Sequence, residues 1–220
     1  MRVIIPAKST STRVPNKNWR DFYRGKSLVD INILAILNAG IAPDHIHVSS
    51  DSLDHLETVQ ARYGVIGLPR DESLCHNDTS IGDFIRCISS QVTGHDDIAW
   101  SQVCDPLFNE HAEVFKHWET VKALGYDSLS VVHPVRQYMM TNDMRPIGWG
   151  FGQGHVQSQK LTTLYQFPFT LSVLTRDCIK ICGYHIGANP RWFVSSSRSI
   201  DIDTESDFEV ARILYERQHA

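Results

Sequence analysis

The stretch RVIIPAKSTSTRVPNKN, residues 2–18, joins a short apolar run to a basic loop rich in hydroxyl groups. The apolar run is typical of a buried strand, because it is short and ends at a proline. The loop combines Lys8, Arg13 and Lys17 with small side chains, and backbone amides in such a loop can approach an anion closely. It therefore suits a polyphosphate. It contains neither the GxxxxGK[ST] nor the GxGxxG pattern, and a solvated polar turn is the plainer alternative.

Strand-like and helix-like patterns alternate along the first 135 residues. After the first strand, further strands are predicted at 45–51, 65–69, 97–103 and 128–135, and helices at 27–40, 52–64, 79–92 and 109–125, the last capped by Asn109. This alternation predicts an α/β fold with a mostly parallel central sheet flanked by helices. Strands at 169–177 and 199–204 and a helix at 205–218 complete the prediction. Because ligands bind beyond the carboxyl ends of such strands, the first loops should converge on one site.

The alternation stops between about residues 136 and 168. We interpret the chain as one domain, residues 1–220, with a lid or dimerisation segment inserted there, because long irregular loops usually carry a function. The segment holds large aromatic side chains: Tyr138, Trp149, Phe151 and Tyr165. Left exposed, they would form a larger apolar patch than monomers normally show, so we expect a homodimer.

Bulk composition limits the partners. The 220-residue chain has a formal net charge of −4, which argues against a nucleic-acid-binding protein. It has no apolar run long enough to span a membrane. Its five cysteines are scattered and odd in number, as expected of reduced thiols in the cytoplasm. A basic loop on a mildly acidic protein indicates a small anionic ligand.

Several segments, in order, resemble the signature of the cytidylyltransferases that activate sugar acids, such as the acylneuraminate and 3-deoxy-manno-octulosonate enzymes. They are IPAKSTSTRVPNKN (5–18), VSSDS (48–52), RDESLCHNDTS (70–80), SQVCDPLFN (101–109) and SIDIDTESDFEVARIL (199–214). The chain departs from the family pattern where Lys8 replaces an arginine and Ser27 a proline. It also lacks the asparagine–glycine pair that the sialic acid enzymes carry before their final strands. The corresponding segment here is LYQFPFTLSVLTRD (164–177).

The resemblance implies a glycosyltransferase-A-like, Rossmann-like nucleotidyltransferase that transfers CMP from CTP to an acid and releases pyrophosphate, with Mg²⁺ (or Mn²⁺) as cofactor. It assigns Lys8, Ser11 and Lys17 to the phosphates, and it leaves open whether Lys8 fully replaces the arginine, since lysine lacks the two-pronged geometry of a guanidinium. Contacts with the nucleotide are also expected from Asn18, Arg70, Asp78 and Gln102.

Two carboxylates are candidate metal ligands. Asp201 and Asp203 are two residues apart in a predicted strand, so both side chains would point to the same side. Mg²⁺ prefers oxygen ligands and keeps several waters. Asp105 is a candidate third ligand. An acidic cluster that only stabilises the start of the last helix is the alternative. We expect Lys8, Lys17, Asp201 and Asp203 to be catalytic.

The acceptor is less defined than the nucleotide. The cations available to hold a small acidic acceptor are Arg136, Arg145, Lys160 and Arg176. A nonulosonic or ulosonic sugar acid is the first choice. A phosphonate or phosphate remains open, because its attacking oxygen is already anionic and needs no base. A third possibility, of another class, is a nucleotide-binding regulatory protein without turnover.

Overall fold

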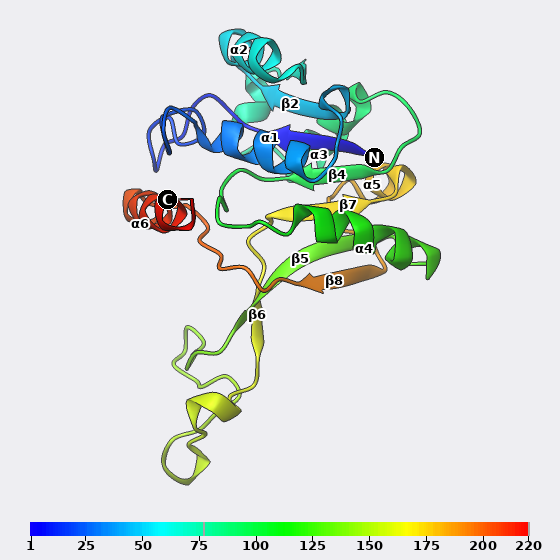
Figure 1. The fold of residues 1–220 in the computed structure, drawn as a ribbon. Helices are drawn as coiled ribbons and strands as arrows, with labels where there is room; N and C mark the ends of the chain where they lie inside the picture. The colour runs from blue at the N-terminus through cyan, green and yellow to red at the C-terminus, as the bar shows by residue number, and fades with distance from the viewer. Residues whose placement is uncertain (77, 220) are drawn as a thin grey trace.

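The computed structural model describes residues 1–76 and 78–219. One eight-stranded sheet forms its centre, in the order β3-β2-β1-β4-β7-β5-β6, with β8 paired to β5 (Figure 1). The strands are β1 Arg2–Pro6, β2 Ile46–Ser50, β3 Ile66–Pro69, β4 Ile98–Ser101, β5 Ser128–Val135, β6 Leu164–Gln166, β7 Leu171–Leu174 and β8 Pro190–Val194.

Strand direction confirms the predicted sheet. β1 runs parallel to β2 and β4, β2 runs parallel to β3, and β5 runs parallel to β8. β7 lies between β4 and β5 and is antiparallel to both. Its insertion leaves β4 and β5 pointing the same way, so the sheet is mostly parallel.

Helices cover both faces of the sheet. They are α1 Leu28–Asn38, α2 Leu53–Tyr63, α3 Ile81–Gln91, α4 His111–Ala123, α5 Arg176–Cys182 and α6 Glu205–Gln218. Figure 1 shows α1 and α4 in front of the sheet and α3 and α5 behind it. Successive side chains of β1 point to opposite faces. Val3 and Ile5 therefore join the core that includes residues of α1 and α4, and Ile4 joins the core under α3 and α5.

Ser27 has a structural role at the start of α1. Its hydroxyl caps the helix, and its main-chain N–H donates to the Asp30 carboxylate at 2.7 Å, which completes a capping box. Arg62 and Tyr63 also donate to Asp30, each at 2.8 Å. Burial alone would raise the pKa of Asp30, but these hydrogen bonds and the charge of Arg62 outweigh it and hold the pKa below its usual range. The replacement of the family proline by Ser27 is thus explained by helix capping.

Three predicted elements need correction. Residues 199–204 form no strand, because β8, which the sequence did not reveal, already occupies the place beside β5. The predicted strand 169–177 ends at Leu174, and Thr175 then caps α5. The N-cap of α4 is Glu110 and not Asn109, and the Glu110 carboxylate accepts hydrogen bonds from the main-chain N–H groups of Ser196 and Ser197.

Residues 136–168 project from the sheet as an arm (Figure 1). The arm contains the short 3-10 helices Gly152–Gly154 and Ser158–Lys160 and returns through β6, which pairs with the end of β5. Its aromatic side chains pack mainly on one another, and Phe151 remains 69% exposed. The irregular excursion predicted here is therefore present. Among the described residues, no helix has the length and apolar character needed to cross a bilayer.

Candidate functional site

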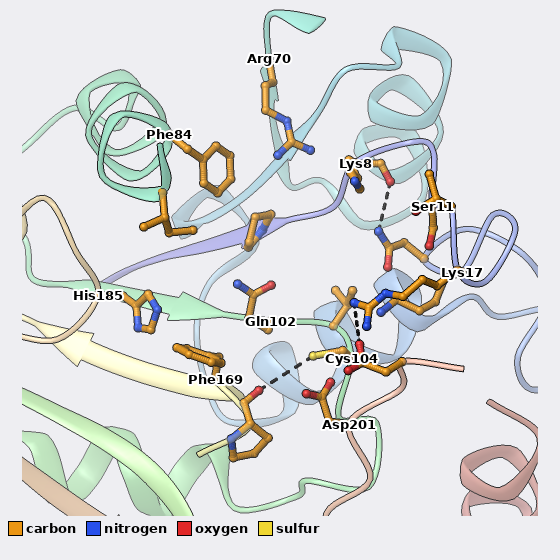
Figure 2. A pocket seen from close by; sticks show the side chains of 18 of the residues that line it. Lys8, Ser11, Lys17, Arg70, Phe84, Gln102, Cys104, Phe169, His185 and Asp201 are labelled. Atoms are coloured by element: carbon orange, nitrogen blue, oxygen red, sulfur yellow. Dashed lines mark hydrogen bonds and ion pairs between the residues drawn. The ribbon is translucent and has the colours of Figure 1, made fainter. Parts of the chain in front are cut away.

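A cavity of about 840 Å³ opens at the carboxyl ends of β1, β3 and β4 (Figure 2). The segments before β7 and before α6 close its far side. Its lining includes Pro6, Lys8, Ser11, Thr12, Arg13, Lys17, Asn18, Arg70, Ile81, Phe84, Gln102, Val103, Cys104, Pro168, Phe169, Tyr184, His185, Asp201 and Asp203. The loops after β1, β3 and β4 converge on this site as expected, whereas the loop after β2 contributes no residue to the lining.

The loop after β1 is folded back on itself. The side-chain amide of Asn18 donates to the main-chain carbonyl of Lys8 at 3.1 Å, and the Trp19 indole donates to the same oxygen at 3.2 Å. Ser9 donates from its main-chain N–H to the Asp51 carboxylate at 2.7 Å, which fixes the loop to the end of β2. Lys8, Ser11 and Lys17 lie together on one side of the cavity (Figure 2). A preorganised loop with positive charge and hydroxyl groups can hold a polyphosphate.

Arg70 places a buried guanidinium at the end of the cavity away from Asp201 (Figure 2). Its side chain is only 4% exposed, and its Nε and Nη2 atoms have no hydrogen-bond partner. The guanidinium lies over the Phe84 ring, 5.1 Å from the ring centroid, and its Nη2 is 3.9 Å from an oxygen of Asp51. Burial lowers the pKa of Arg70, which remains a cation at neutral pH. Buried donors without acceptors are unfavourable, so these atoms are poised for an acceptor that a ligand brings.

Asp201 and Asp203 both face the cavity, although no strand holds them. Ile202, between them, is buried and donates its main-chain N–H to the Cys104 carbonyl at 3.0 Å, which turns both carboxylates the same way. Burial and the charge of Asp203 raise the pKa of Asp201. The hydrogen bond from the Cys104 thiol and the charge of Lys17 lower it, but the net effect is a raised pKa. Lys17 itself donates to the Ile202 carbonyl at 2.6 Å.

The two carboxylates fit a hard divalent cation. Mg²⁺ is typically held by one or two carboxylates together with waters and substrate phosphates, and Mn²⁺ accepts the same ligands. No group of three or more His, Cys, Asp or Glu side chains within residues 1–76 and 78–219 could hold a metal ion. A cation here would therefore depend on oxygen atoms from the nucleotide. Arg13 forms an ion pair with Asp203, with 2.7 Å between Nη2 and a carboxylate oxygen.

The expectation that Asp105 is a metal ligand is corrected by its surroundings. Its side chain is fully buried and accepts hydrogen bonds from the hydroxyls of Thr170 and Ser199, each at 2.9 Å. Burial raises the pKa of Asp105, and the two hydrogen bonds, which lower it, do not fully offset this effect. Asp105 therefore ties the segments that precede β7 and α6 to the end of β4, beneath the cavity.

The prediction that Arg176 holds the acceptor is also wrong. Because β7 is antiparallel to β4, its carboxyl end lies at the sheet edge opposite the cavity. There Arg176 is buried and donates to the main-chain carbonyls of Val92 and Asp96. It supports the turn before β4 and cannot hold an acceptor in the cavity.

Other predicted residues lie outside the cavity lining. Asp78 is exposed in the turn before α3, next to a residue outside the described part of the chain. Arg136, Arg145 and Lys160 are exposed on the arm, so within one chain they do not reach the cavity. Gln102, in contrast, lines it at the end of β4, where its main-chain N–H donates to the Thr170 carbonyl at 3.0 Å.

Sequence reasoning missed the aromatic lining. Phe84 comes from α3, Phe169 from the segment before β7, and Tyr184 and His185 from the segment after α5. Phe84 lies in a segment that the sequence predicted only as a helix, and α5 was not predicted. The aromatic pair around proline in QFPFT (166–170) was the one available signal.

The fold and the cavity define a nucleotidyltransferase: an α/β sheet with a basic loop and an acidic pair at its carboxyl edge. Comparison with known proteins narrows the class. Residues 2–87 match the cytidylyltransferase family model. The pseudaminic acid cytidylyltransferase of Campylobacter jejuni subsp. jejuni strain 81-176 is 29% identical over 98% of this chain and 96% of its own, and that of a second strain is 28% identical over the same shares. The predicted class, a CTP-dependent cytidylyltransferase, is confirmed.

Solved structures agree on the fold. A CMP:2-keto-3-deoxy-manno-octonic acid synthetase complexed with CTP has a TM-score of 0.68 at 14% identity, covering 99% of this chain and 98% of its own. The 4-diphosphocytidyl-2C-methyl-D-erythritol synthase of Anaerococcus prevotii has a TM-score of 0.64 at 10% identity, covering 98% and 99%. At these identities the likeness shows the fold alone. It confirms the predicted α/β fold with a central sheet flanked by helices.

Proposed function

We propose that this protein transfers CMP from CTP to an acidic sugar of the pseudaminic acid type and releases pyrophosphate. The near full-length likeness to two pseudaminic acid cytidylyltransferases supports the acceptor. The observation that carries the proposal is the order of groups around the cavity. Arg70, with buried donors that lack hydrogen-bond partners, lies at one end, the basic loop lies between, and Asp201 lies at the other end (Figure 2). Asp203 also lines the cavity.

In this reaction a hydroxyl oxygen of the acceptor attacks the α-phosphorus of CTP, its proton passes to solvent water, and the bond to the pyrophosphate oxygen breaks. Arg70 donates to the ring acceptors of cytosine, with Phe84 holding the guanidinium plane. Lys8, Ser11 and Lys17 neutralise and hold the phosphates, so that negative charge developing on the leaving group meets fixed positive charge and hydroxyl donors.

A divalent cation held at this acidic pair would supply positive charge against the negative charge of the triphosphate. Asp201 and Asp203 are the residues that would hold it. Lys17 positions the pair through its hydrogen bond to the carbonyl of Ile202, which lies between the two carboxylates in the chain. The same lysine therefore connects the phosphate loop to the acidic segment.

The arm supports a homodimer. Tyr165, Trp192 and Val194 are 56%, 45% and 52% exposed, and together with Phe167 they line an apolar hollow where the base of the arm meets β8. β8 has no strand on its outer side among the described residues. A second copy packed there would cover this surface and bring the arm cations Arg145 and Lys160 toward the partner's cavity.

The cysteines of the chain are free thiols, as expected of a protein that functions in the reducing cytoplasm.

A pyrophosphate-release assay tests the activity. The protein is mixed with CTP and Mg²⁺ and with pseudaminic acid, N-acetylneuraminic acid, 3-deoxy-manno-octulosonic acid or a small phosphonate, and CTP is replaced by UTP, ATP and GTP as controls. We expect release with CTP and pseudaminic acid well above every other combination. Release that is largest with the phosphonate would overturn the sugar-acid proposal, and release that is equal with all nucleotides would overturn the cytidine assignment.

A further inference from the structure

Phe169 has a main-chain conformation that aromatic residues rarely adopt. Its φ is +59°, in the left-handed region, where the Cβ atom of an L-residue crowds the following carbonyl oxygen. Glycine would occupy this position without that strain. Strained residues persist where the surrounding structure holds them, and they concentrate at functional sites.

The neighbours of Phe169 hold it in place. Pro168, with its restricted backbone, precedes it. Thr170 follows it, and its hydroxyl donates to the buried Asp105 carboxylate at 2.9 Å, while its carbonyl accepts from the Gln102 N–H at 3.0 Å. The backbone on either side of the ring is therefore fixed to the end of β4, and the ring has little freedom to leave the cavity.

The ring itself is only partly covered by protein. It is 39% exposed, although it packs against the Phe167 ring at 4.4 Å and meets the His185 ring edge-on at 5.2 Å. Figure 2 shows Phe169 beside Gln102 and His185, on the side of the cavity away from the phosphate loop. An aromatic face open to a cavity is available for an apolar ligand group.

This end of the cavity contains no cationic side chain among its described lining residues. Pro168, Phe169, Tyr184 and His185 form it, and burial lowers the pKa of His185 to about 4, so the imidazole is neutral at pH 7. Its Nδ1 lies 3.4 Å from the Ser172 hydroxyl. Such a surface suits an uncharged, partly apolar part of a ligand and not its carboxylate.

We propose that Phe169 is a specificity-determining residue for the acceptor, selecting sugar acids that present an N-acyl or methyl substituent to its ring. The proposal rests on the proposed cytidyl transfer. It also gives a role to the segment in which this chain lacks the asparagine–glycine pair of the sialic acid enzymes. A hydroxyl group of an acceptor placed against the Phe169 ring would lose hydration without gaining a hydrogen bond there.

Steady-state kinetics of Phe169→Gly and Phe169→Ala test the proposal, with Phe84→Ala as the matched aromatic variant at the nucleotide end. The acceptors are pseudaminic acid and a nonulosonic pair that differ only by N-acetyl or hydroxyl at one carbon. For both Phe169 variants we expect the KM of pseudaminic acid to rise at least tenfold and the KM of CTP to change less than twofold. The preference for the N-acetyl compound should approach one. Phe84→Ala should show the reverse pattern in KM.

Thermal unfolding separates binding from folding. Phe169→Gly relieves the left-handed strain but loses the packing of the ring on Phe167 and His185, so these opposing effects should leave its melting temperature close to that of the original protein while its acceptor KM rises. An unchanged acceptor KM, or a loss of stability with parallel changes in both KM values, overturns the inference. If the unaltered protein releases no pyrophosphate with any acid, the proposed function fails instead, which is a different result.

Discussion

Replacement of Arg70 by lysine removes the guanidinium while keeping the charge. The Nε and Nη2 atoms of Arg70 are buried without a hydrogen-bond partner, in a side chain that lines the cavity. Lysine can supply at most one comparable donor there. A hydrogen bond from a charged donor is worth roughly 1.5–3 kcal/mol, so loss of one predicts about 10- to 150-fold weaker CTP binding. The preference for CTP over UTP should fall as well, because the N3 atom of cytosine accepts a hydrogen bond and that of uracil donates one.

Isothermal titration calorimetry with CTP and UTP, each with Mg²⁺, measures both quantities. Arg62→Lys is the matched control, because Arg62 makes its ion pair with Asp30 at 2.8 Å near the start of α1 and does not line the cavity. We expect the Kd of that variant to stay within twofold of the original value. If Arg70→Lys bound CTP as tightly as the unaltered protein, the assignment of Arg70 to the base would be wrong.

Three further results are expected. Asp201→Asn and Asp203→Asn should each abolish turnover with little loss of stability, and normal rates across a Mg²⁺ titration would contradict the metal assignment. Burial lowers the pKa of His111 and His185 to about 4, so the unfolded chain binds protons first as the pH falls below about 6.5. The free energy of unfolding should then decrease by about 2 kcal/mol for each histidine between pH 7 and pH 5. Urea unfolding at the two pH values checks this, and a His111→Gln variant with an unchanged pH dependence would refute it. Light scattering should show twice the chain mass, reduced to a monomer by Tyr165→Asp; a fully active monomer would refute the proposed dimer.

The central sheet and its first helices could be predicted because the local patterns agree with the fold. Apolar runs ended by proline, glycine or polar residues gave β1 to β5 close to their observed bounds. The parallel order of the first four strands then placed Lys8, Arg70 and Gln102 at one edge of the sheet. These residues follow directly from strand ends, so a small error in an element boundary did not displace them.

The parts of the fold and the site that the sequence did not predict depend on contacts between distant segments, which local patterns do not encode. The reversed direction of β7 put Arg176 at the far edge of the sheet. Asp105 turned inward because Thr170 and Ser199, 65 and 94 residues away in the chain, donate to it. Asp201 and Asp203 face the cavity as expected, but the reason is the anchored Ile202 between them and not a strand. The aromatic end of the cavity includes the segment after α5, a helix that the sequence did not predict.

The most direct test of the central claim is phosphorus NMR of one reaction mixture. The protein is incubated with CTP, Mg²⁺ and pseudaminic acid, and the spectrum is followed over time. Cytidyl transfer predicts that the three CTP signals decline together while one phosphodiester signal and inorganic pyrophosphate appear in equal molar amounts. CTP that stays intact, or that is hydrolysed to nucleotide and phosphate without a phosphodiester signal, would contradict the assignment of this protein as a cytidylyltransferase acting on sugar acids.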